Sequence, residues 1–61
     1  MLYELILYDG ATRIPLPESF KTKFWKKSNA IRVAKITFKF YIGNIAVVNK
    51  LTRRIVYVCE D

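Results

Sequence analysis

Histidine is absent from the 61-residue sequence, and Cys59 is the single cysteine. The usual zinc ligand sets cannot be assembled from these residues, and one cysteine forms no intrachain disulfide. A domain of this size usually needs a disulfide, a metal or a partner subunit to supplement its small core. The sequence therefore predicts no cofactor, and it favours association with a second copy or with another chain.

Carboxylates are also scarce, with five Asp and Glu against eleven Lys and Arg. Glu4 and Glu18 have no spacing that would let them work as an acid and base pair. The two glycines, Gly10 and Gly43, are too far apart for a phosphate-binding loop. No base is identifiable beside Cys59, which is expected to close the last strand. The sequence therefore predicts a binding protein and not an enzyme.

Long apolar runs are missing as well. No stretch approaches the roughly 18 apolar residues of a membrane-spanning helix, and the residues after Met1 lack the pattern of a secretory signal. An amphipathic helix for attachment to an anionic membrane surface is not recognisable. We therefore expect a cytoplasmic, reducing environment and no membrane partner, and we expect residues 1–61 to form one domain because so short a chain cannot divide its core.

The chain does contain short apolar segments separated by turn residues, as strands of a small β protein are. Residues 2–8 run into Asp9 and Gly10, a pair that tolerates the positive φ angles of a type I′ hairpin turn. Residues 11–16 are the expected returning strand, limited by Pro15 because proline donates no ladder hydrogen bond.

The clearest alternation of apolar and polar side chains lies within residues 30–41, and it predicts a strand. Residues 26–29 are expected to form the turn before it, and Gly43-Asn44 the turn after Ile42. The expected core face of this strand comprises Ala34, Ile36, Phe38 and Phe40. Arg32 would point to the same side, which suggests that the strand bends or begins a residue or two later. Further strands are expected over residues 45–48 and 54–59, joined by a turn at 49–53.

Residues 20–25 leave helix and strand open. Phe20 and Phe24 alternate with lysines as in a strand, yet they are also one helical turn apart. We predict a mainly β fold, a small antiparallel meander of five or six strands that forms a curled sheet or an open barrel. The alternative is an α+β fold with one short helix near residues 18–27.

Positive charge is concentrated in the middle of the chain, where eleven basic residues and one acid, Glu18, lie between Gly10 and Val58. Aromatic rings and lysines interleave over residues 20–27, and such a face can stack on bases while ammonium groups neutralise phosphates. Ordinary core aromatics beside a solvated charged face would give the same pattern. The candidate nucleic-acid-binding residues are Lys21, Lys23, Trp25, Lys26, Lys27, Arg32, Lys35, Lys39, Arg53 and Arg54.

The leading prediction is a DNA- or RNA-binding module that contacts the phosphate backbone with low sequence specificity, since no recognition helix is evident. The alternative is a small protein-binding regulator or inhibitor, of the kind phages and plasmids encode. It would act on an acidic protein through the basic face or through the exposed edge of the last strand. The same edge is a candidate for pairing two copies into a homodimer.

In its size, its basic charge, its opening hairpin and a Trp between lysines, the chain resembles the small archaeal chromatin proteins that lay a curved sheet in the minor groove. The likeness is architectural, because no motif matches theirs residue by residue. Neither site residues nor activity are carried over from it.

Overall fold

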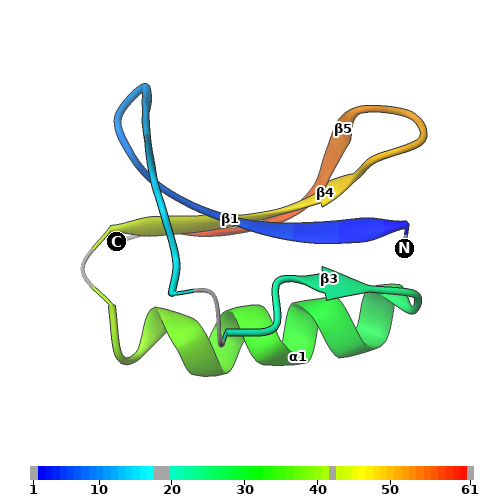
Figure 1. Cartoon of the computed structure of the whole chain (residues 1–61), viewed down its shortest axis with the longest axis horizontal. Helices are drawn as coiled ribbons and strands as arrows, with labels where there is room; N and C mark the ends of the chain where they lie inside the picture. The colour runs from blue at the N-terminus through cyan, green and yellow to red at the C-terminus, as the bar shows by residue number, and fades with distance from the viewer. Residues whose placement is uncertain (1, 18–19, 42, 61) are drawn as a thin grey trace.

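The computed structural model describes residues 2–17, 20–41 and 43–60. In this part of the chain one helix and five strands follow in the order β1 (Tyr3–Asp9), β2 (Thr12–Ile14), β3 (Lys23–Phe24), α1 (Lys27–Phe38), β4 (Asn44–Asn49) and β5 (Arg54–Cys59). The strands form one antiparallel sheet that curls without closing, and α1 covers one of its faces (Figure 1). The predicted mainly β fold is confirmed.

The sheet is organised around β1, which has neighbours on both sides. Along one side β1 pairs with β4, and β4 pairs with β5. Along the other side β1 pairs first with β3 and then with β2. In the described residues β5 pairs with β4 alone, so the last strand is an edge of the sheet as expected. Both hairpin turns curl away from the helix (Figure 1).

The first hairpin turns one residue later than predicted. Asp9 pairs with Thr12, which leaves Gly10 and Ala11 as the two turn residues. Gly10 has a φ of +59°, whereas the φ of Ala11 is negative. This combination belongs to a type II′ turn, in which glycine takes the first central position. The type I′ turn predicted at Asp9-Gly10 is therefore wrong, although strand and hairpin are both present.

The segment that alternates most clearly in the sequence is a helix. α1 spans Lys27–Phe38 and buries Ala30, Ala34 and Thr37, which are spaced by four and three residues as one face of a helix requires. The strand predicted over residues 30–41 and the turn predicted over 26–29 are therefore wrong. Burial of one helical face against the sheet outweighs the β propensity of the branched residues in this segment.

Other predictions for this part of the chain are corrected as well. Ile36 and Phe40, expected on the core face, are exposed at 51% and 78%, and Arg32 is exposed as well. The helix proposed as an alternative near residues 18–27 is not there in the described part, residues 20–26, where the chain instead forms the short strand β3. Residues 18 and 19 lie outside the described residues, as does Ile42.

The core lies between α1 and the facing side of the sheet. Leu5 and Leu7 of β1 and Ile45 and Val47 of β4 are buried there, and Phe24 and Cys59 close the two sides. The small side chains of Ala30 and Ala34, both 0% exposed, let the helix backbone approach the sheet closely. The core therefore fixes the direction and the rotation of α1, which decides what its outer faces present.

The connection from α1 back to the sheet depends on Gly43. Its φ is +123°, and a Cβ atom at this position would lie 3.0 Å from the carbonyl oxygen of Tyr8. Only glycine adopts this backbone conformation without strain. The strands predicted over 45–48 and 54–59 and the turn over 49–53 are confirmed as β4, β5 and their connection. Within the described residues, no helix has the length and apolar character to cross a membrane.

Candidate nucleic-acid interface

The outward face of α1 carries a row of cations that we call the cationic stripe, Arg32, Lys35 and Lys39. The three are exposed and recur at intervals of three and four residues, the spacing that places side chains on one face of a helix. Arg32 donates a hydrogen bond of 3.4 Å from Nη2 to Oδ1 of Asn29. The Nζ atom of Lys35 lies 5.7 Å from the centre of the Tyr57 ring, so this lysine leans toward β5.

The stripe continues into the connection between β3 and α1. Trp25 is 70% exposed there, and Lys26 and Lys27 beside it are exposed as well. No acidic residue lies in the first helical turn and no side chain caps it. The positive end of the helix dipole therefore adds to the lysine charges. From Lys27 to Lys39 this surface extends along the helix by about 18 Å.

The sheet register brings a second group of cations to the same end of the molecule. One row of paired residues crosses the sheet from β3 through β1 and β4 to β5, namely Phe24, Tyr3, Asn49 and Arg54. Three strand spacings, about 14 Å, therefore separate the β3–α1 connection from the β4–β5 hairpin, and both lie at the right of Figure 1. We call this region the basic end. It comprises Trp25, Lys26, Lys27, Lys50, Arg53 and Arg54, all of them exposed.

The β4–β5 turn holds its arginines in a defined backbone. Asn49 Oδ1 accepts hydrogen bonds from the amides of Leu51 at 2.9 Å and Thr52 at 3.2 Å. Arg53 has a φ of +58°, the left-handed conformation that allows this short turn to return into β5. Arg53 and Arg54 are therefore presented by an ordered hairpin.

Two of the predicted residues lie away from this surface. Lys23 is directly opposite Glu4 in the sheet, on the face that α1 does not cover, where the opposite charges offset each other. Lys21 places its Nζ atom 5.3 Å from the centre of the Phe24 ring. The structure thus brings eight of the ten predicted residues to the stripe and the basic end and leaves Lys21 and Lys23 outside.

Carboxylates gather at the opposite end of the sheet. Asp9 ends β1 and Glu60 follows β5, whereas residues 20–59 contain ten Lys and Arg and no Asp or Glu. Partial burial, followed by the nearby Glu60 carboxylate, raises the pKa of Tyr8. The charge of the molecule is therefore polarised along the strand direction.

An apolar groove, called the groove below, runs along the flank of α1 beside the stripe and encloses about 510 Å³. The rings of Phe20 and Tyr41 meet edge to face with their centres 6.1 Å apart and form one wall. The groove is lined by Phe20, Lys21, Val33, Ile36, Thr37, Phe40 and Tyr41. The sequence pattern did not identify it, because the strand prediction assigned Ile36 and Phe40 to the core.

Thr37 lies at the floor of this groove. Its side chain lines the groove but is only 2% exposed, and its Oγ1 atom has no hydrogen-bond partner within the described residues. The backbone carbonyl of Thr37, in contrast, accepts from the amides of Phe40 and Tyr41. A buried hydroxyl without a partner destabilises a fold by about 1–3 kcal/mol, so its presence here requires a reason.

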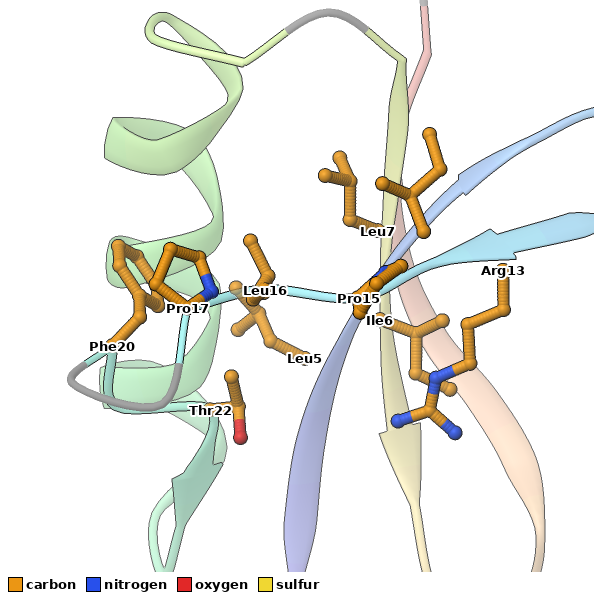
Figure 2. A pocket seen from close by; sticks show the side chains of 10 residues that line it. Leu5, Ile6, Leu7, Arg13, Pro15, Leu16, Pro17, Phe20 and Thr22 are labelled. Atoms are coloured by element: carbon orange, nitrogen blue, oxygen red, sulfur yellow. The ribbon is translucent and has the colours of Figure 1, made fainter.

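A second pocket, of about 340 Å³, lies where the edge of β1 is left between β3 and β2 (Figure 2). The chain leaves the sheet after Ile14, and Pro15 and Pro17 have no amide hydrogen with which to continue the ladder. In Figure 2, Pro17 and Phe20 lie against α1, whereas Arg13 extends on the other side of the sheet. There Nη2 of Arg13, the one cation among the described residues that line this pocket, is 3.8 Å from Oε1 of Glu4.

Comparison with known proteins gives no relative: no family model, no curated protein and no solved structure matches this chain. Among the residues that the structure describes, no group of three or more His, Cys, Asp or Glu side chains is arranged to hold a metal ion. The proposals below therefore depend on the stripe, the basic end and the groove alone.

Proposed function

We propose that the protein binds nucleic acid by contacting the phosphate backbone with the cationic stripe and the basic end. The observation that carries this proposal is the set of exposed cations along α1 and at its N-terminal end. An outward helix face with three cations leads into Trp25, Lys26 and Lys27, with no carboxylate anywhere in residues 20–59. Such a surface attracts phosphates and releases the counterions condensed on them, which drives salt-sensitive binding.

Each part of the surface has a role in this proposal. Arg32 and Lys39, about 10 Å apart along the helix, follow a phosphate backbone, and Lys26 and Lys27 extend the contact beyond the helix. Trp25 offers an exposed ring that packs on a base or a sugar. Asn29, the one amide side chain on α1, accepts a hydrogen bond from Arg32. We expect the Lys and Arg side chains of this helix to contact phosphates, so that specificity is low.

The test compares two lysine pairs with equal charge change. In Lys26→Glu/Lys27→Glu we expect binding to a mixed-sequence DNA duplex to weaken on all sequences alike. The slope of log affinity against log salt between about 50 and 200 mM should fall by about two, one for each lost phosphate contact. The matched control is Lys21→Glu/Lys23→Glu, which should weaken binding only through the long-range field. Titrations followed by Trp25 fluorescence measure both.

Three results would contradict the proposal. The first is equal loss of binding in the two double variants, which would mean that net charge and not this surface decides affinity. The second is unchanged binding in Lys26→Glu/Lys27→Glu. The third is loss on one duplex sequence with none on others, because backbone contacts carry no direct sequence information.

A further inference from the structure

The groove has features that nucleic-acid binding does not explain. Ile36 is 51% and Phe40 is 78% exposed, although both lie in a chain with a small core that would gain from burying them. They are on the flank of α1 next to the stripe, and they line the groove together with Phe20 and Tyr41. A phosphate backbone offers nothing apolar to cover these side chains.

Thr37 adds a second and independent observation. Its hydroxyl is buried at the floor of the groove without a hydrogen-bond partner within the described residues. The carbonyl oxygen of Val33, one turn earlier on the helix, does not accept from it. Solvent does not reach the hydroxyl in this conformation, so a ligand reaches it only when the side chains of the groove move apart. A group that enters the groove with a hydrogen-bond donor or acceptor would satisfy this hydroxyl, and the apolar walls would hold the carbon part of the same group.

The shape of the groove distinguishes between kinds of occupant. Sites for small molecules enclose most of the ligand surface. Here the walls formed by Ile36 and Phe40 stand open to solvent, so a small molecule would stay largely in water. Side chains projecting from a protein segment suit an open groove better, because the rest of the segment covers the rim.

Charge gives the chemical class of that segment. Lys21 lines the groove, and residues 20–59 contain no carboxylate that would balance its charge. We propose that the groove binds an acidic protein segment, which inserts an apolar anchor side chain between Phe20 and Phe40 and hydrogen-bonds to the hydroxyl of Thr37. This inference does not depend on nucleic-acid binding, because the residues that line the groove lie off the stripe and off the basic end.

The experiment selects random 16-residue peptides, displayed on phage, against the folded protein in excess duplex DNA that occupies the cationic surface. We expect the enriched peptides to be acidic and to carry Phe, Leu or Trp. Their affinity should fall at least tenfold for Phe40→Asp. The matched control is Leu51→Asp, in the β4–β5 hairpin, because Leu51 is 82% exposed and its replacement makes the same chemical change away from the groove. It should alter affinity less than twofold.

Thr37→Val tests the hydrogen bond separately. Valine keeps the shape of threonine without the hydroxyl, so the protein should unfold at the same temperature or higher while peptide affinity falls about fivefold. Circular dichroism establishes that each variant is folded.

Four results would overturn the inference. They are enrichment of no peptide, enrichment of neutral or basic peptides, equal loss in Phe40→Asp and Leu51→Asp, and a protein dimer in sedimentation that Phe40→Asp dissociates. The last result would assign the groove to a second copy of this chain. None of the four affects the lysine-pair test, so the two proposals fail separately.

Discussion

The outward face of α1 and its flank at the groove differ in chemistry although their residues follow the same spacing. Arg32, Lys35 and Lys39 form the stripe, and Val33, Ile36 and Phe40 line the groove. Each groove residue follows a stripe residue by one position in the sequence, and one position corresponds to about 100° around the helix axis. A twelve-residue helix therefore separates a surface for phosphates from a surface for apolar anchors, while a third row packs on the sheet.

Both surfaces depend on the inward row of α1, the buried residues Ala30, Ala34 and Thr37. Ala30 and Ala34 are fully buried against the sheet, and their size sets how closely and in which rotation the helix docks. A rotation by one residue in one direction would bring Val33, Ile36 and Phe40 to the outward face, and in the other direction it would bring the cations into the groove. The core thus positions both proposed sites at once.

The largest effect on stability is expected from Ala34→Leu, which would disturb the stripe and the groove together. Overpacking the closed space between α1 and the sheet destabilises by about 1–3 kcal/mol, which lowers the melting temperature of a domain this small by roughly 5–20 °C. Thermal unfolding by circular dichroism measures the change. Ile36→Leu, on the exposed flank, is the control and should shift the melting temperature by less than about 3 °C. Equal shifts in both variants would contradict the assigned inward row.

The smallest effect concerns the acidic end, which neither proposed surface includes. Partial burial and the Glu60 carboxylate raise the pKa of Tyr8 above its ordinary value of 10.0. The folded state thus favours the neutral phenol, and this contribution is complete below about pH 10 and is lost as pH rises through the raised pKa of the folded state.

Urea unfolding should therefore show the wild type losing stability above about pH 10 slightly more steeply than Tyr8→Phe. The other three tyrosines are common to both proteins and cancel in the comparison. Affinity for duplex DNA at neutral pH should be the same in both. A Tyr8→Phe variant that binds DNA less tightly would show that the acidic end takes part in binding.

The sequence predicted the two hairpins well because their signals are local. Strong β formers in residues 2–8 and 54–59 and turn residues between the strands decide those elements without reference to the rest of the chain. The first turn was misplaced by one residue because glycine suits either central position, and only the pairing of Asp9 with Thr12 distinguishes them.

The helix was missed because apolar residues occupy three of its faces. Ala34 is in the core, Ile36 is in the groove, and Phe38 packs on the opposite flank, so that apolar positions recur every second residue as in a strand. Whether such a segment becomes a helix depends on the sheet face that it covers, which is assembled from distant residues.

The sequence identified the cations of the site, but it did not predict their arrangement on one face of a helix. The intervals between Arg32, Lys35 and Lys39 were the signal for one helical face, and the strand interpretation divided them between two faces. Lys21 and Lys23 were included because they lie beside Trp25 in sequence, whereas the chain turns them toward the groove and toward Glu4.

The central claim is that the outward face of α1, with the stripe, binds nucleic acid and that the flank with the groove does not. It is tested most directly by titrating isotopically labelled protein with a mixed-sequence DNA duplex at about 50 mM salt and following amide and indole resonances by NMR. We expect shifts at Trp25, Lys27 and along the stripe, with Ile36 and Phe40 unchanged. Shifts confined to the groove or to β5, or no shifts at all, would contradict the account.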